Sequence, residues 1–600
     1  MSEPTASAPS SIGARLVRVL VRLLDLTPFR LTFFLALVMI PLGQVFRLPN
    51  HGGFTLDWQF FQFFDEVARR TIADYHQFPF WNPYFCGGTT MIGNPQTTFL
   101  VPTFPLVLWF GTTFGERLSN IPVLVLGCEG GWRLMRWLGV RRSAALLVAV
   151  ALPFYARTWE WFHDGQHGLS GWALSLWVIY GYLRGLQRPV YLVLGGAFLA
   201  WMVSYRGIET TPELALGLFV WAIFEVRRRL LDPTERARGW RHLLWPIGAG
   251  AVLGLFALGF AGVRMVPVFD LVLNHHRIVN ENTRLHLSRA LVEHFAIRPR
   301  TVGYEAPGYA YIGLLTWLLF FGSMLVARGR KRAGIPSVVA LFFVLLSMGY
   351  QGVFTPLHWL HKAPLFKVFR NPTLWSFGAA LFMVIAAGLA LDELVAYFEE
   401  RKWQRAARYL APLVALLVTV DLLYFAQWIT SPPHAPFAYG PAPFVEQEFR
   451  QARGNRMEQV LWVYLNRGSL SCYDETPFTT GNGLRADLPD EEYLADPAAG
   501  SVRRVRWTPN ALELEATLTS PGTVLVNQNW DTGWSTSAGT LRAHDGILAV
   551  DLPAGTTRFR LTYWPRGSTI GLLLMLLAAV GAWWMIRRDR RQLSAGSASG

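Results

Sequence analysis

The sequence predicts a polytopic α-helical membrane protein of about twelve spans with a C-terminal extracytoplasmic β-sandwich domain. The chain has 600 residues, is 52% hydrophobic and only 16% charged, and carries 25 Trp and 41 Phe, more than one soluble core buries. Apolar runs long enough to cross a hydrocarbon layer of roughly 30 Å alternate with short basic segments. From residue 502 the pattern changes to short alternating stretches that are typical of strands.

The order of the apolar runs sets the topology. The candidate spans are 30–47, 119–138, 143–158, 169–186, 190–204, 212–226, 243–264, 309–327, 335–350, 373–391, 407–428 and 568–586. A further run, 98–114, is barely long enough to cross and contains Pro102 and Pro105. If it stays in the outer interface, the arginine-rich segments, among them 227–241 and 587–591, all collect in the cytoplasm. We therefore predict that 98–114 does not cross and that both chain ends are cytoplasmic.

Charge and cysteine content argue against two other classes of protein. The formal net charge of +15 resides in short clusters between apolar runs, so we expect no nucleic-acid partner. Three cysteines, Cys86, Cys128 and Cys472, rule out a disulfide framework and leave room for at most one bridge. Cys86 and Cys472 can meet only if both face the oxidising side, and we do not predict that pairing.

Three regions follow from this topology. Residues 1–428 form the transmembrane domain, with a first outer loop at 48–118. Residues 429–567 form an extracytoplasmic mixed and β-sandwich domain, in which "ALELEATL" and "TRFRLTYW" alternate and Pro-Gly and Asp-Gly pairs mark turns. Residues 568–600 form the last transmembrane helix and a basic cytoplasmic tail.

Ionisable residues that interrupt apolar sequence gather on the outer side in this topology. They are Asp57, Asp65, Glu66, His163, Asp164, His167, Arg206, Glu209, Glu213, Asp270, His275, His276, Arg277, Lys367 and Arg370. A site that opens outward needs this distribution. A transporter usually places polar groups near the midplane and often shows repeats.

The first outer loop predicts a short helix over 57–72, with Asp57 at its N-terminal end. Its phenylalanines, such as Phe60 and Phe64, are expected to lie in the lipid interface. Asp57 has an alternative role as a helix N-cap. Asp65 and Glu66 have an alternative reading as a solvated face paired with Arg69.

Several stretches together resemble a known family. "FPFWNPYFCGGTTMIGNPQ" follows the first outer acid, "FKVFRNP" comes later, and "NWDTGWSTSAGTLRAHDGILAVDLPAGTTRFRLTYWP" precedes the last helix. In this order they are similar to the YfhO-type membrane proteins of the GT-C glycosyltransferase superfamily. The resemblance implies a GT-C-like fold in a bacterial cytoplasmic membrane. It also implies a transferase that moves a sugar from polyprenyl (undecaprenyl) phosphate to a cell-envelope glycan, lipid or protein.

The same resemblance implies that an acid of the first outer loop is the catalytic base. By position this is Asp57, with Asp65 as second choice, although the adjacent acid pair frequent in the superfamily is spread over eight residues here. Nucleotide sugars are not available outside the membrane, so the donor there must be lipid-linked. Cations must then stabilise the departing phosphate, and Arg370 is the first candidate, with Lys367 and Arg277 behind it. Arg370 has an alternative role as an interface anchor.

The remaining candidates are assigned to the cavity or the acceptor. They are His163, His167, Arg206, Glu209, Glu213, Trp530 and Trp534. The two tryptophans either stack on a sugar or close the sandwich core. His163 and His167 have a spacing that suits a metal, but Gly165 makes a helix there doubtful, so no metal site is predicted and a divalent cofactor stays open.

Other readings remain beside the transferase. Glu129 falls inside a predicted span, and we interpret it as a structural pair with Arg133. The chain could instead be a glycolipid transporter or flippase, or a non-catalytic assembly factor that binds glycans through its outer domain. Membrane lipid, a carrier-linked sugar and an envelope glycan or lipid are the expected partners.

Overall fold

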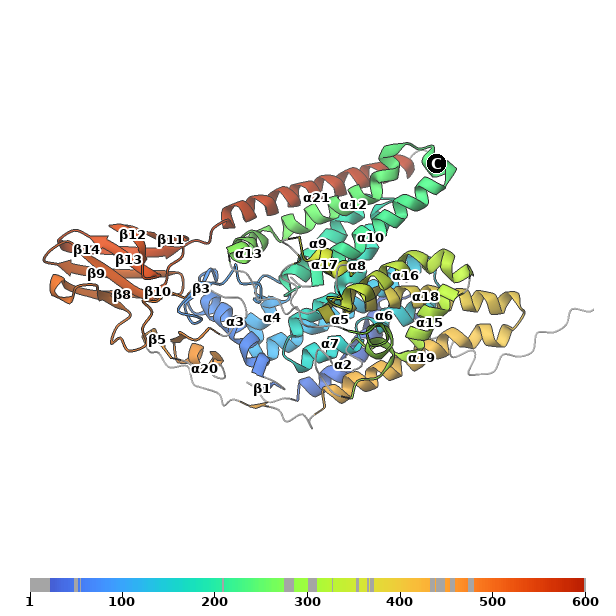
Figure 1. The fold of residues 1–600 in the computed structure, drawn as a ribbon, viewed down its shortest axis with the longest axis horizontal. Helices are drawn as coiled ribbons and strands as arrows, with labels where there is room; N and C mark the ends of the chain where they lie inside the picture. The colour runs from blue at the N-terminus through green and yellow to red at the C-terminus, as the bar shows by residue number, and fades with distance from the viewer. Residues whose placement is uncertain are drawn as a thin grey trace, which may run out of the picture.

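The computed structural model describes residues 22–47, 52–53, 56–207, 210–274, 285–300, 310–325, 327–351, 355–363, 366, 372–431, 437–438, 448–453, 459–472 and 480–597. Within these residues the chain is mostly helical up to α19, and a β-rich region and one last long helix follow (Figure 1). The helices run roughly parallel to one long direction, and the β-rich region caps one end of them (Figure 1).

A helix lies in every predicted span. These helices are α2 (Thr27–Val45), α5 (Thr112–Trp137), α6 (Arg142–Ala151), α8 (Ser175–Gly185), α9 (Val190–Ser204), α10 (Thr210–Leu231), α12 (Trp240–Phe260), α15 (Leu314–Leu325), α16 (Ala327–Ser347), α18 (Ser376–Glu400), α19 (Gln404–Ile429) and α21 (Ser568–Ser597). Among the described residues, five helical stretches are long and apolar enough to cross a membrane: Thr27–Val45, Trp240–Phe260, Pro372–Glu400, Gln404–Ile429 and Ser568–Ser594. An integral membrane protein is therefore confirmed, and the count of twelve crossings stays a prediction.

Shorter elements connect these helices, mostly at the end that faces the β-rich region. They are α3 (Leu56–Ala73), α4 (Phe104–Phe110), α7 (Ala156–His163), η1 (His167–Leu174), α11 (Pro233–Arg236), α13 (Gly262–Asn274), η2 (Arg289–Glu293), α14 (His294–Ala296), α17 (Pro356–Leu360), η4 (Pro372–Trp375) and α20 (Gln459–Tyr464). The 7-residue helix α4 ends at Gly111, whose φ is 76°. At about 1.5 Å per residue this helix is too short to cross by itself, and the prediction that 98–114 does not span stays a prediction.

Helices α18 and α21 show the two environments of the bundle. The apolar stretch of α18 is 100% buried inside the protein, whereas that of α21 is 11% buried. A helix that is apolar all round belongs in a core, and an apolar helix left open fits lipid. Where α18 approaches its C-terminal end, Asp392 pairs with Arg141 at 3.1 Å and with Arg332 at 2.7 Å, so its one buried acid is neutralised.

Ion pairs of Glu129 and of Asp589 join neighbouring elements of the bundle. Glu129 of α5 pairs with Arg133 at 2.6 Å, as predicted, and also with Arg30 of α2 at 2.6 Å. Arg188 pairs with Asp589 of α21 at 2.6 Å. The C-terminus lies at the end of the molecule far from the β-rich region (Figure 1).

The β-rich region contains two antiparallel four-stranded sheets in the orders β12-β13-β10-β7 and β11-β14-β9-β8. The strands are β7 (Glu492–Leu494), β8 (Gly500–Thr508), β9 (Ala511–Leu518), β10 (Gly522–Asn529), β11 (Trp534–Thr536), β12 (Thr540–His544), β13 (Ile547–Leu552) and β14 (Gly555–Tyr563). Leu514, Val526, Val550 and Leu561 from both sheets share one apolar cluster. Asp545 and Gly546 have positive φ in the turn between β12 and β13, as their sequence predicts.

Short strand pairs join distant parts of the chain. They are β1 (Gly52–Gly53) with β4 (Phe437–Ala438), β2 (Trp81–Asn82) with β3 (Thr89–Thr90), and β5 (Arg450–Ala452) with β6 (Arg467–Ser469). The predicted β-rich C-terminal region is confirmed, and its description as a separate sandwich domain stays a prediction.

The first outer loop is anchored in the β-rich region. Trp81 belongs to the apolar cluster of the two sheets, and its Nε1 donates to Gln528 Oε1 at 2.8 Å. The Asn529 amide donates to the Cys86 carbonyl at 2.6 Å. Cys86 and Cys472 form a disulfide, so our expectation against this pairing was wrong. The two cysteines are 386 residues apart, and only the tertiary fold brings them together.

Candidate functional site

Helix α3, which carries Asp57 and Asp65, lies inside the protein. Phe60, Phe64 and Phe85 pack edge to face, with ring centroids 5.1 Å apart for Phe60–Phe64 and 5.5 Å for Phe64–Phe85. All three rings are buried. The prediction that the aromatic side of this helix lies in lipid was therefore wrong. Residues of the segment from Tyr84 to Val101 share one apolar cluster with α3, and they supply the apolar partners that lipid was expected to supply.

The two adjacent acids of α3 are buried as well. Asp65 is 2% exposed and Glu66 is 0% exposed, so the reading as a solvated face was wrong. Glu66 pairs with Arg69 at 2.7 Å and accepts a hydrogen bond from Thr112 Oγ1 at 2.5 Å. Asp65 instead accepts a hydrogen bond from Thr98 Oγ1 at 2.5 Å. The two carboxylates thus contact different partners, and of the two only Glu66 forms an ion pair within its own helix.

Asp65 belongs to a group that we call the buried charged cluster: Asp65, Glu116, Arg206 and Arg264. Each of the four is at most 6% exposed. The carboxyl groups of Asp65 and Glu116 interact with each other, and both attract the guanidinium of Arg206. Arg264 also feels the charge of Asp65. Two acids and two arginines thus lie together in the interior, where an ionised group needs a partner.

Backbone carbonyls accept hydrogen bonds from both arginines. Arg206 Nε donates to the Gln96 carbonyl at 2.7 Å, and its guanidinium lies 3.9 Å from the ring centre of Phe61. Arg264 donates to the carbonyls of Pro95 at 2.8 Å and Ser204 at 3.1 Å. Burial lowers the pKa of Arg206, and the nearby carboxylates of Asp65 and Glu116 oppose that shift.

Asp57 stands at the edge of this cluster. Its side chain is half-buried, and Gln166 Nε2 donates to its Oδ2 at 3.2 Å. Arg206 also feels the charge of Asp57. Trp58 Nε1 donates to the His163 carbonyl at 3.1 Å, so the segment after α7 sits on the first turn of α3. The structure therefore brings together Asp57, His163 and Arg206. The sequence predicted only that these three residues lie on the same side of the membrane.

Gly165 makes this approach possible. Its φ is 78°, and a Cβ at this position would lie 2.4 Å from the backbone nitrogen of Trp58. A residue larger than glycine would push the segment away from α3. A close backbone contact with Trp58 thus explains the glycine at position 165, which in the sequence argued against a helix between His163 and His167.

The other predicted site residues fall into three groups. Glu213 of α10 is fully buried and lies near Tyr155. His163 contacts Asp164 at 3.1 Å, and the described residues contain no group of three His, Cys, Asp or Glu side chains arranged to hold a metal ion. Arg277, Lys367, Arg370, Glu209, His275, His276 and the side chain of His167 lie outside what the structure describes.

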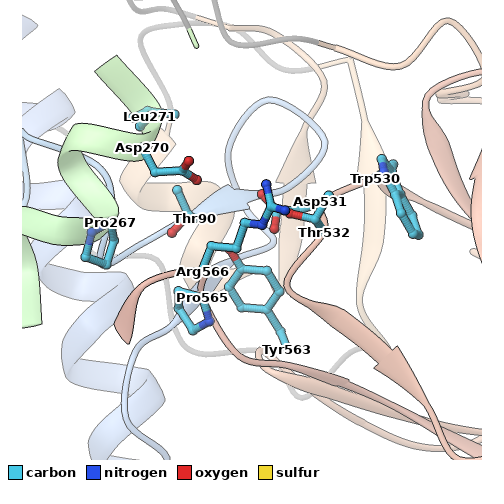
Figure 2. A pocket seen from close by; sticks show the side chains of 10 residues that line it. All are labelled: Thr90, Pro267, Asp270, Leu271, Trp530, Asp531, Thr532, Tyr563, Pro565 and Arg566. Atoms are coloured by element: carbon cyan, nitrogen blue, oxygen red, sulfur yellow. The ribbon is translucent and has the colours of Figure 1, made fainter. Parts of the chain in front are cut away.

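A cavity of about 320 Å³ opens where the β-rich region meets α13, and we call it the junction cavity. Asp270 of α13, Thr90 of β3, and Asp531, Tyr563 and Arg566 of the β-rich region line it (Figure 2). Burial raises the pKa of Asp531, whose carboxylate accepts a hydrogen bond from the Gly533 amide at 2.7 Å.

The two tryptophans proposed for sugar stacking differ in position. Trp530 is among the residues that line the junction cavity, and its ring also packs against the apolar cluster of the two sheets, so its role stays a prediction. Trp534 is 5% exposed and packs between Trp81 and Tyr563, at centroid distances of 5.4 and 5.3 Å. The assignment of Trp534 to a sugar site was therefore wrong, because this ring closes the apolar core.

A second cavity, of about 230 Å³, is lined by Arg298, Arg300 and aromatic residues of α19. Asp57 lines neither of these two cavities. Sequence reasoning missed Glu116, Arg264 and Arg298. Glu116 and Arg264 could have been found as ionisable residues at the end of an apolar run, next to an outer segment.

These features define the class: an integral membrane protein with a buried charged cluster and an open polar cavity beside a C-terminal β-rich region. No protein-family model and no curated protein matches the chain. Among solved structures, the arabinofuranosyltransferase AftD from Mycobacteria is similar at a TM-score of 0.39 and 14% identity, over 70% of this chain and 27% of that one.

The oligosaccharyltransferase of Archaeoglobus fulgidus is also similar. Its apo form matches at a TM-score of 0.39 and 12% identity, over 75% of this chain and 65% of that one. Its complex with an inhibitory peptide and a dolichol-phosphate matches at 0.40 and 12%, over 76% of this chain and 66% of that one. The chain thus spans less than two thirds of the length of these proteins. Likeness at this level carries no argument for function, which rests on the site itself.

Proposed function

We propose that the chain is a membrane glycosyltransferase of the GT-C type. It transfers a sugar from a polyprenyl-phosphate donor to an extracytoplasmic acceptor, which is a cell-envelope glycan, lipid or protein. The observation that carries this proposal is the pairing of a half-buried carboxylate, Asp57, with a fully buried charged cluster beside it. The buried charged cluster holds the site rigid. Asp57 is less buried than the acids of the cluster and is available to contact a substrate.

The disulfide supports an outward-facing site. A Cys86–Cys472 bridge forms and persists in an oxidising compartment, and Cys86 follows α3 in the first outer loop. Basic segments such as 587–591 lie at the other end of the molecule, as the positive-inside rule requires of a cytoplasmic side. A donor outside the cytoplasm must be lipid-linked, and this favours a polyprenyl-phosphate sugar in a bacterial cytoplasmic membrane.

In the proposed reaction Asp57 accepts the proton of an acceptor hydroxyl. The oxygen attacks the anomeric carbon of the donor, and the bond from that carbon to the phosphate oxygen breaks. The electron pair leaves with the lipid phosphate. Asp65 is a positioning residue, because at 2% exposure it reaches the site only through Thr98, Glu116 and Arg206.

The departing phosphate needs a cation. Arg370, Lys367 and Arg277 remain our proposal for this role, and all three lie outside the described residues. His163, Glu209 and Glu213 remain proposed as neighbours of the acceptor. A divalent metal stays open as a further helper.

One observation favours a second candidate, a non-catalytic assembly factor that binds glycans. Asp57 lines neither described cavity, whereas the junction cavity is polar, open and partly built by the β-rich region. Such a factor would use the junction cavity and would not need Asp57.

Mass analysis of envelope glycans and lipid-linked sugars, in cells with and without the protein, separates the two. Loss of one sugar from an envelope glycan together with accumulation of one polyprenyl-phosphate sugar supports transfer. An unchanged carrier pool with altered polymer assembly supports the assembly factor and contradicts the transferase.

A further inference from the structure

The junction cavity is built from three parts of the chain. Thr90 comes from the first outer loop, Asp270 from α13, and Asp531, Tyr563 and Arg566 from the β-rich region. Figure 2 shows the carboxylates of Asp270 and Asp531 and the guanidinium of Arg566 around one space. A volume of about 320 Å³ falls within the range of small-ligand sites.

The polar groups of the cavity are held in place by one another. The Tyr563 hydroxyl interacts with Asp531 and Thr90, and the charges of Asp270 and Asp531 act on each other. The Gly533 amide fixes the Asp531 carboxylate at 2.7 Å. Carboxylates accept hydrogen bonds, a guanidinium donates them, and hydroxyls do both. This combination matches the ring of hydroxyl groups on a sugar, each of which is both donor and acceptor.

The charge and the lining argue against other ligands. Two carboxylates face one guanidinium, so a phosphate or another anion would meet net repulsion. The described residues offer no cluster of three metal-ligating side chains. Apolar lining is confined mainly to Pro267, Leu271 and Pro565, too little for a lipid tail. Trp530 is also among the lining residues, but its ring packs against the apolar cluster of the two sheets and lies apart from the other labelled side chains in Figure 2.

The cavity is adjacent to the buried charged cluster through two segments. On the first, Thr90 lines the cavity, the Gln96 carbonyl accepts from Arg206, and Thr98 donates to Asp65. On the second, α13 carries both Asp270 and Arg264, about 9 Å apart along the helix at 1.5 Å per residue. A ligand in the cavity therefore lies next to the elements that hold the buried charged cluster.

We propose that the junction cavity binds a neutral, hydroxyl-rich saccharide, the part of the acceptor that precedes the hydroxyl to be glycosylated. Asp270 and Asp531 accept hydrogen bonds from its hydroxyls, and Arg566 donates to its ring or hydroxyl oxygens. The identification of this saccharide as the acceptor rests on the proposed function. The binding of a neutral saccharide itself does not depend on transfer.

The test uses the full-length protein in detergent micelles. The probe is an oligosaccharide mixture released from the envelope of the source cells, and the retained species are identified by mass spectrometry. Asp270→Asn and Asp531→Asn are compared with Asp545→Asn, a matched control whose carboxylate is 74% exposed in the turn between β12 and β13. Asp57→Asn is included to separate binding from transfer, and thermal unfolding of each variant checks its fold.

The expected result is retention of neutral oligosaccharides by the unchanged protein, by Asp545→Asn and by Asp57→Asn. Retention falls about tenfold or more in Asp270→Asn and Asp531→Asn, the size of one lost charge-assisted hydrogen bond. Retention of no oligosaccharide, or equal retention by all variants, overturns the proposal even if transfer is demonstrated. Retention in the absence of any transfer keeps this binding site and overturns the proposed enzyme instead.

Discussion

The buried charged cluster and the junction cavity are built from the same types of side chain and differ in access to solvent. In the cluster, Asp65, Glu116, Arg206 and Arg264 are each at most 6% exposed, and each acts on another member of the cluster. In the cavity, Asp270 and Arg566 are exposed, and the charges do not balance. The comparison shows that burial, more than residue type, distinguishes charged side chains that stabilise the fold from charged side chains that can bind a ligand.

Removal of one partner of a buried pair should give the largest effect. Arg206→Met leaves Asp65 and Glu116 without their shared cation, and we expect a loss of about 3–5 kcal/mol in the free energy of unfolding. Arg566→Met, at the exposed cavity, should change it by less than about 0.5 kcal/mol. Denaturant unfolding of the two variants in the same detergent measures the contrast. Equal effects would show that the cluster is not a structural unit.

A buried acid whose desolvation outweighs its neighbouring charges should respond to pH. Glu491 is 2% exposed, and burial raises its pKa to about 7. Its folded-state pKa lies above the unfolded value, so its contribution to stability is present at low pH and is lost as pH rises through about 7. A shift of this size corresponds to roughly 3 kcal/mol.

Glu491→Gln should remove this loss. Hydrogen exchange of the amides in β7 and β10, compared between the variant and the unchanged protein at each pH, measures it. The two proteins should differ little near pH 4, below the unfolded pKa of 4.5, and the variant should be better protected at pH 8, above the folded pKa of about 7. Equal protection at pH 8 would mean that the Glu491 carboxylate is not desolvated.

A smaller effect is expected from a single hydrogen bond inside the cluster. Thr98→Val removes the hydroxyl that donates to Asp65 at 2.5 Å and preserves the shape of the side chain. Leaving a buried carboxylate short of one donor costs about 1–3 kcal/mol. Thr517→Val, whose partner Thr556 lies on an exposed sheet surface, is the matched control and should cost far less. If the control costs as much, burial does not set the difference.

Local patterns predicted the elements of this fold well. Every predicted span holds a helix, and the Asp545–Gly546 turn sits where its sequence places it. These features depend on apolar length and on the backbone preferences of a few neighbouring residues, which a sequence displays directly.

The surroundings of α3 were not predictable in this way. Whether Phe64 faces lipid or protein depends on what folds over the helix, and Phe85 does so only because distant parts of the chain meet. The Cys86–Cys472 bridge spans 386 residues, and no local pattern indicates it. Glu116 and Arg264 likewise join Asp65 through tertiary packing, so their spacing along the chain carries no signal of the cluster.

The most direct test of the central claim compares Asp57→Asn with Asp545→Asn in a transfer assay that uses a radiolabelled polyprenyl-phosphate sugar and isolated envelope acceptor. If Asp57 is the base, Asp57→Asn lowers the transfer rate by about 10²–10⁴-fold with unchanged membrane insertion, and Asp545→Asn transfers normally. Transfer by Asp57→Asn within about twofold of the unchanged protein would contradict the account.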